Sequence, residues 1–138
     1  MTRLRGPLFL LLFIAVSSIW ILYAQNRANF TGNVTAVEQN PKGAIAHYKF
    51  DPGARTKWHI HEGGQVILLE EGVGRIQAKG GPVIELRPGD TLYAQPGVAH
   101  WHGAAPDQSA TQYNVSRGTV TWLDEVSEKD YTAAPQKR

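Results

Sequence analysis

From Gln25 onward, glycine and proline divide the chain into short segments, and this division argues against long helices. The sequence holds 14 Gly and 8 Pro among 138 residues. Proline fixes φ and glycine permits positive φ, so pairs such as Pro52-Gly53 and Pro96-Gly97 indicate turns. Such short runs between turns predict an all-β fold, either a sandwich or a barrel. The predicted strands are Asn33–Val37, Ala44–Phe50, Lys57–His61, Gln65–Glu70, Gly74–Ala78, Val83–Leu86, Thr91–Ala94, His100–Gly103 and Ala110–Val115.

One short helix is expected near the C-terminus. The segment Ser127-Glu128-Lys129-Asp130 has the pattern of a capping box, in which the serine side chain accepts a hydrogen bond from the first turn of a helix. We expect residues 25–132 to form a single domain, because a chain of this length can bury one core without cross-links. Residues 133–138 are expected to be a flexible tail.

The first 24 residues differ in character and predict an export signal or a membrane anchor. Arg3 and Arg5 give a positive start, and residues 7–24 are almost entirely apolar. This is the layout of a signal peptide cleaved after Ala24, while about 18 apolar residues also suffice to span a hydrocarbon core. Under both interpretations the globular part is exported, to the periplasm or the extracellular space, and only residues 7–24 would contact a membrane.

Charge and composition limit the binding partners and the metal ligands that this chain can have. Residues 25–138 carry 12 basic and 12 acidic side chains, since Arg3 and Arg5 account for two of the 14 basic residues. This balance, with no basic stripe, argues against nucleic-acid binding. The chain contains no cysteine, which excludes disulfides and thiolate metal sites. Imidazole, amide and carboxylate groups remain as candidate metal ligands.

Four of the five histidines form two pairs with one intervening residue. The pairs are His59-Ile60-His61 and His100-Trp101-His102. Residues i and i+2 of a strand point to the same face, so each pair directs two imidazoles to one side. Trp58 and Trp101 then face the opposite side, where we expect them to pack in a core or an interface. Convergent imidazoles are what a divalent transition metal requires.

The spacing around both pairs resembles the two signature motifs of the cupin superfamily. Residues 53–72 read GARTKWHIHEGGQVILLEEG, and residues 89–100 read GDTLYAQPGVAH. The resemblance implies a jelly-roll barrel, also called a double-stranded β-helix, that binds one metal ion per chain. Gln65 occupies the position where most cupins have a carboxylate. The metal ligands implied by the resemblance are His59, His61, Gln65 and His100.

Further strings resemble a subgroup of small bacterial cupins that includes manganese-dependent hydroxynitrile lyases. They are FDPGARTKWHIH, HWHGAAP and TWLDEVSEKDY. Glutamine also takes the carboxylate position in that subgroup, which fits Gln65. The resemblance implies metal-assisted cleavage or formation of a cyanohydrin-like substrate, with manganese preferred and iron, zinc or nickel as alternatives. The lyases have a further histidine where this chain has Gln112, which exchanges hydrogen bonds but takes up no proton near neutral pH. His102 is therefore the candidate catalytic base, and Gln112 is the second candidate catalytic residue.

Two other functions stay open at this point. An iron- or manganese-dependent dioxygenase would use the same ligands, and a non-catalytic small-molecule-binding cupin would need no base. Gln65 and Gln112 favour the binding protein slightly, because each replaces an ionisable group found in other cupins. Cupins commonly cover an exposed edge strand by pairing two copies, so a homodimer is expected.

Overall fold

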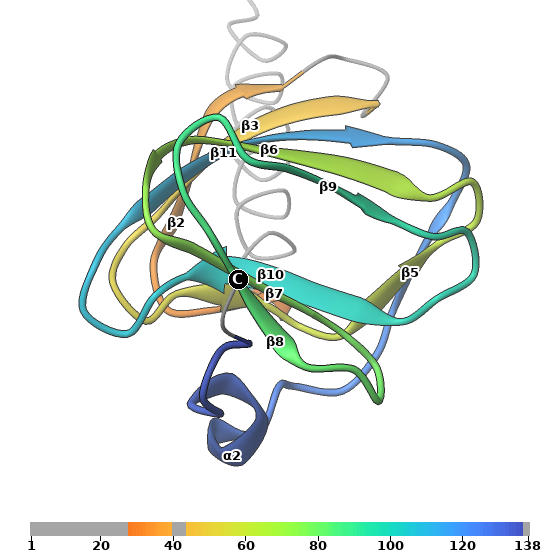
Figure 1. Cartoon of the computed structure of the whole chain (residues 1–138). Coiled ribbons are helices and arrows are strands. Elements are labelled where there is room, and N and C mark those ends of the chain that lie inside the picture. Colours follow the sequence, from red (N-terminus) through yellow and green to blue (C-terminus); the bar gives the residue numbers. More distant parts are fainter. Residues whose placement is uncertain (1–27, 40–43, 137–138) are drawn as a thin grey trace, which may run out of the picture.

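The computed structural model describes residues 28–39 and 44–136, and within them the chain forms two curled sheets and one short helix (Figure 1). The all-β prediction and the C-terminal helix are confirmed. The predicted signal or anchor at residues 1–24 lies outside the described residues, and no helix within the described ranges is long and apolar enough to cross a membrane. The elements are β1 (Phe30–Thr31), β2 (Val34–Gln39), β3 (Ile45–Phe50), β4 (Arg55–Thr56), β5 (His59–His61), β6 (Gln65–Gly72), β7 (Gly74–Ala78), β8 (Val83–Leu86), β9 (Thr91–Ala94), β10 (His100–Ala104), β11 (Ala110–Ser116), β12 (Val120–Trp122) and α2 (Glu128–Tyr131).

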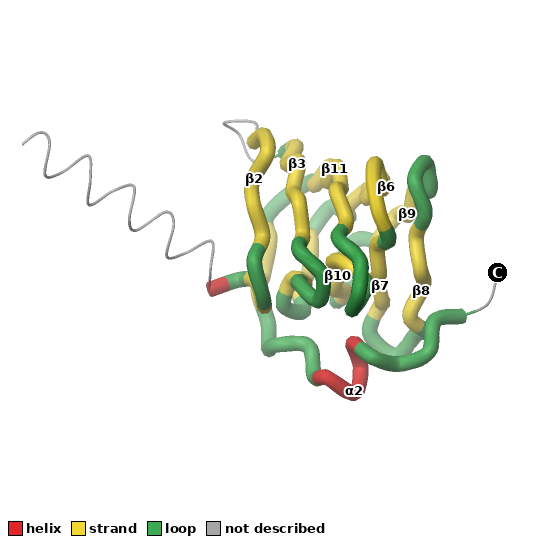
Figure 2. Tube along the Cα trace, turned by 90° about the vertical axis from the view of Figure 1, so that its left-hand side faces the viewer, coloured by secondary structure: helices red, strands yellow, loops and turns green. Residues whose placement is uncertain are grey.

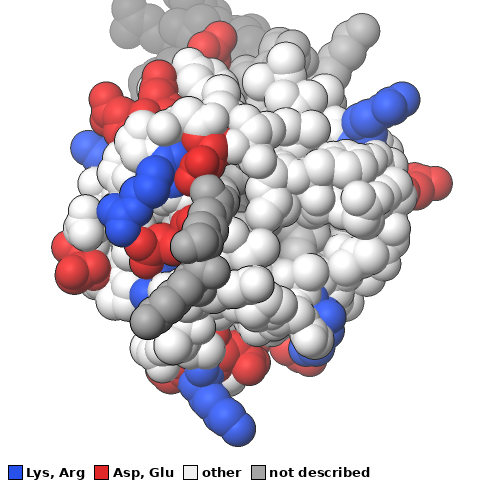
Figure 3. Space-filling view, viewed as in Figure 1, with Lys and Arg blue, Asp and Glu red and all other residues white. Residues whose placement is uncertain are grey.

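The two sheets face each other as the walls of a barrel (Figure 2). One sheet has the strand order β2-β3-β11-β6-β9. In the other, β10 pairs with β7 on one side and with β4 and β5 on the other; β8, β1 and β12 extend this sheet. On the face shown in Figure 3, acidic and basic side chains are interspersed and much of the surface is uncharged.

Apolar side chains fill the interior of the barrel next to the histidines, and Phe50 meets the His102 ring edge to face, with 5.8 Å between ring centroids. Burying each large apolar side chain contributes about 1.5–3 kcal/mol to stability, so this cluster holds the two sheets together. Its buried members are Phe50, Ala54, Ile67, Leu69, Ile76, Leu86, Ala104 and Ala110.

A second cluster forms on the outer side of β10, beneath α2. Trp58 and Trp101 are 4% and 0% exposed and pack with Val83, Val126 and Tyr131. The indole Nε1 of Trp101 donates to Gln77 Oε1 at 2.9 Å. The prediction that both tryptophans face away from the histidines and pack in a core is therefore confirmed.

The C-terminal segment covers this second cluster. Ser127 caps α2, since its Oγ accepts from Asp130 N–H at 3.1 Å. The Tyr131 hydroxyl donates to Ala104 O at 2.8 Å. Within the predicted tail, Ala133 packs against the cluster and Gln136 N–H donates to Val83 O at 2.8 Å. These contacts fix the outer face of β10, whose inner face carries two of the histidines.

Gly103 on β10 is a position where any side chain would collide with β4. A Cβ atom there would overlap Ala54 O and lie 2.6 Å from Arg55 Cα. Gly103→Ala is therefore expected to lower the free energy of unfolding by about 1–3 kcal/mol, measured by urea denaturation. Gly81→Ala, where a Cβ meets only Ala78 O at 3.3 Å, is the control and should cost much less. Equal stability of the two variants would contradict the close approach of β4 and β10.

Candidate metal centre

Strand pairing brings the two histidine pairs together. In the antiparallel ladder of β5 and β10, His59 lies directly opposite His100. Their ring centroids are 4.4 Å apart, and those of His59 and His61 are 5.1 Å apart. Ligand nitrogens of His59, His61 and His100 all lie within 4.8 Å of one another, and the three residues are buried. The structure thus assembles a three-histidine cluster that can hold a divalent metal ion.

Hydrogen bonds to the backbone orient two of these imidazoles. His59 Nδ1 donates to Lys57 O at 2.9 Å, and His100 Nδ1 donates to Val98 O at 3.1 Å. A carbonyl oxygen can only accept, so both Nδ1 atoms carry the hydrogen and both Nε2 atoms carry the lone pair. Such contacts from the second nitrogen fix the tautomer of metal-binding histidines.

Gln65 adds a fourth candidate ligand from β6. Its Oε1 lies 3.0 Å from His100 Nε2, while its Nε2 donates to Ser116 Oγ at 3.0 Å. The Val98 contact leaves His100 Nε2 as an acceptor, so two acceptors face each other without a hydrogen between them. Ligand atoms about 2.1 Å from one ion and at right angles are about 3 Å apart. Gln65 Oε1 and His100 Nε2 are therefore placed to act as ligands of a bound cation. Such a cation would relieve the repulsion between their two lone pairs.

Burial keeps these imidazoles neutral. Desolvation by burial, followed by the charge of His100, lowers the pKa of His59 from 6.5 to about 3. The same two causes lower the pKa of His61 from 6.5 to about 4. Desolvation also lowers the pKa of His100. Metal ligands must be deprotonated, so the cluster is prepared to bind a cation at neutral pH.

His102 lies beside the cluster and is held by Gln112. His102 Nδ1 lies 2.9 Å from Gln112 Oε1, and Gln112 Nε2 donates to Gly103 O at 2.9 Å. The Gly103 carbonyl fixes the amide orientation, so His102 Nδ1 carries the hydrogen and Nε2 carries the lone pair. Desolvation, followed by the charge of His59, lowers the pKa of His102 well below its usual value. The two candidate catalytic residues thus form one hydrogen-bonded unit.

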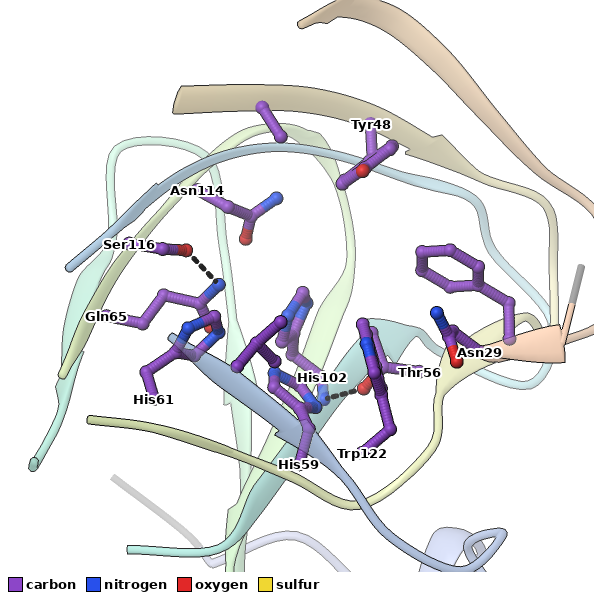
Figure 4. Close-up of a pocket in the computed structure, with 13 residues that line it drawn as sticks. Asn29, Tyr48, Thr56, His59, His61, Gln65, His102, Asn114, Ser116 and Trp122 are labelled. Carbon is purple, nitrogen blue, oxygen red and sulfur yellow. Dashed lines mark hydrogen bonds between the residues drawn. The ribbon is translucent and has the colours of Figure 1, made fainter. Parts of the chain in front are cut away.

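A cavity of about 200 Å³ opens beside the histidines (Figure 4). His61, Gln65 and Asn114 lie at one end, and aromatic rings wall the other end, where Asn29 and Thr56 also lie. Trp122 lies 4.8 Å from His59 between ring centroids, and Phe30 lies 6.1 Å from Trp122 and 5.6 Å from Tyr48. The lining residues are Asn29, Phe30, Ala46, Tyr48, Thr56, His59, His61, Gln65, His102, Asn114, Ser116, Val120 and Trp122.

Several of these lining residues were not among the sequence predictions. Phe30 and Trp122 belong to β1 and β12, strands of two and three residues that carry too little sequence signal to predict. Asn114 and Ser116 could have been found, because they follow Gln112 at two-residue intervals and therefore share its inward face. The side chains of the pocket wall that faces the histidines can thus be predicted in part from strand alternation alone.

Comparison with known proteins assigns the chain to a family. Residues 46–116 match the family model described as the cupin domain. The chain is a cupin. It is 40% identical over 111 residues to an (R)-mandelonitrile lyase from Granulicella tundricola, an alignment that covers 74% of this chain and 85% of that protein. The resemblance drawn from the two histidine motifs is therefore confirmed.

Solved structures agree with this assignment. The crystal structure of a cupin-like protein from Thermotoga maritima superposes with a TM-score of 0.66 and 38% identity, covering 75% of this chain and 86% of that chain. The polyketide cyclase RemF from Streptomyces resistomycificus shares the fold, with a TM-score of 0.54 and 23% identity over 75% of this chain and 76% of that one. The cupin barrel is thus established from both sequence and structure.

Acid should destabilise the metal-free cupin through its histidines. The unfolded chain binds protons near pH 6.5, whereas folded His59 and His61 bind them only near 3 and 4. Between these values the unfolded state holds more protons, so stability falls as the pH is lowered. The expected slope is up to about 1.4 kcal/mol per pH unit for each imidazole. Urea denaturation across this range measures it, and His59→Asn should flatten the slope. Stability that rises toward acid pH would contradict the burial of these groups.

Proposed function

We propose that this cupin is a metal-dependent lyase that cleaves or forms small hydroxynitriles. The observation that carries the proposal is the combination of the three-histidine cluster and Gln65 with 40% identity to an (R)-mandelonitrile lyase over 85% of its length. A cavity of about 200 Å³ is smaller than the usual range of about 300–1,000 Å³ for drug-sized ligands, so it suits a small substrate.

The proposed metal ligands are His59, His61, His100 and Gln65, and the proposed ion is Mn²⁺. All four side chains are neutral, so a divalent ion would keep its full double charge. A bound ion would supply Lewis-acid stabilisation of negative charge on a substrate oxygen. Neutral ligands support this role, because they leave more positive charge at the site than a carboxylate would.

His102 is the proposed base. Its Nε2 carries the lone pair because Nδ1–H is held by Gln112, and its side chain lines the cavity. In the cleavage direction Nε2 accepts the hydroxyl proton of the cyanohydrin. The oxygen electron pair forms the carbonyl double bond and the bond to the nitrile carbon breaks. The departing cyanide takes the proton from His102 Nε2 and leaves as hydrogen cyanide, which returns His102 to its neutral form. Gln112 is a positioning residue, because it fixes which nitrogen of His102 faces the substrate.

The two ends of the cavity match the two parts of an aryl cyanohydrin. Rings of Phe30, Tyr48 and Trp122 wall one end, where an aryl group would pack. His61, Gln65 and Asn114 lie at the other end, where a hydroxyl and a nitrile would lie (Figure 4). This division supports mandelonitrile as the first substrate to test.

Cyanide release from mandelonitrile by the manganese-loaded protein tests the proposal. His102→Ala should reduce kcat by about 10²–10⁴-fold, the usual contribution of general base catalysis, and should retain the metal. His47→Ala is the matched control, because His47 pairs with Glu70 and stacks on Tyr113 away from the cavity. Its activity should equal that of the unmodified protein.

Three outcomes would overturn parts of this proposal. Full activity in His102→Ala would exclude His102 as the base. Substrate-dependent oxygen consumption without cyanide release would favour a dioxygenase. Thermal stabilisation by small ligands with no turnover of any of them would favour a binding protein.

Gln65→Glu tests the role of the neutral ligand separately. A carboxylate should tighten metal binding by about tenfold or more, equivalent to about 1.4 kcal/mol. It should also lower kcat, because less positive charge remains to stabilise the developing oxyanion. Metal titration and cyanide release measure the two effects, with the exposed Gln108→Glu as control. Unchanged metal affinity in Gln65→Glu would mean that this side chain does not contact the ion.

A further inference from the structure

The inner face of β11 carries three polar side chains in a row, opposite the histidines. Gln112, Asn114 and Ser116 alternate along the strand and so point into the barrel. The two outer members of this row are engaged. Gln112 holds His102, and Ser116 accepts a hydrogen bond from the amide of Gln65. The middle member, Asn114, supports neither a histidine nor Gln65.

Asn114 carries an unsatisfied polar atom into the cavity. The residue is 2% exposed, and its Oδ1 has no hydrogen-bond partner. Its Nδ2 makes one long contact, 3.5 Å to Gln112 O. That carbonyl can only accept, so the nitrogen faces it and the oxygen is turned away, toward the imidazoles in Figure 4. Buried acceptors are almost always satisfied, so an unpaired one in a binding cavity needs an explanation.

The remaining lining narrows the class of ligand. None of the residues that line the cavity in the described part of the chain is Asp, Glu, Lys or Arg. The side chains around the cavity therefore offer a ligand no charged partner, so they recognise its polar groups through hydrogen bonds. Since Oδ1 is an acceptor, the ligand must supply a donor, and a hydroxyl group is the simplest neutral donor.

We propose that Asn114 Oδ1 accepts a hydrogen bond from the hydroxyl group of the ligand when the ligand first binds, before the O–H turns to His102 Nε2 for proton transfer. Asn114 would thereby select hydroxylated ligands over deoxygenated ones of the same shape. The inference rests on the proposed function for the identity of the site, and it adds a specificity-determining residue. A site built to bond a hydroxyl rejects the analogue without it, because the protein group is then left unpaired.

A matched pair of inert probes tests this without turnover. 1-Phenylethanol and ethylbenzene differ by one hydroxyl group, and their dissociation constants can be measured on the manganese-loaded full chain. The unmodified protein should prefer the alcohol, and Asn114→Leu, which is close to asparagine in size, should reduce that preference by about tenfold. Affinity for ethylbenzene should change little. Asn33→Leu is the control, because Asn33 is exposed, bonds Asp51 and does not line the cavity.

The unfolding temperature is a second measurement, and it distinguishes a ligand-binding role of Asn114 from a purely structural one. Because Oδ1 has no partner to lose, Asn114→Leu should unfold at a temperature equal to or above that of the unmodified protein. Should leucine not fit, Asn114→Ala tests the same loss of preference without added bulk.

An unchanged preference for the alcohol in a folded variant overturns the proposal, as does a lowered unfolding temperature with the preference intact. Cyanide release by the unmodified protein tests the lyase function separately. A failure of the lyase proposal can therefore be distinguished from a failure of the proposal for Asn114.

Discussion

The antiparallel pairing of β5 with β10 is the constraint on which the site depends. It sets His59 opposite His100, and strand alternation then places His61 and His102 on the same inner face. A shift of either strand by one residue would turn its histidines outward and its tryptophan inward. The packing of Trp58 and Trp101 beneath α2 therefore helps to fix the register of β5 and β10 that the histidine cluster needs. The same few strand contacts that close the barrel also assemble the candidate metal centre.

The site consists of neutral groups held by directed hydrogen bonds. Backbone carbonyls fix the tautomers of His59 and His100, Gln112 fixes that of His102, and Ser116 orients Gln65. Burial lowers the pKa of the imidazoles, which disfavours protons as the source of positive charge. Lone pairs then converge on a region that has no charge of its own. A divalent cation would relieve this convergence, and such an ion would be the largest local charge that a substrate meets.

Much of this arrangement could be predicted from the sequence because it depends on local rules. Glycine and proline indicated most of the strands, and the two histidine pairs with their spacing indicated the three histidines that the structure brings together. Which strands pair is a non-local property, so the shape of the cavity could not be derived. Trp122 and Phe30 illustrate this, since each reaches the site from a strand too short to show a period. Asn114 was readable from its alternation with Gln112, but its unpaired oxygen emerges only from the packing around it.

Metal stoichiometry tests the central claim most directly. Metal-free protein would be equilibrated with Mn²⁺, freed of unbound ions by gel filtration and analysed for metal, together with a His59→Ala/His100→Ala variant. The account predicts one ion per chain in the unmodified protein and none in the double variant. Absence of bound metal in the unmodified protein, or equal retention by the variant, would contradict it.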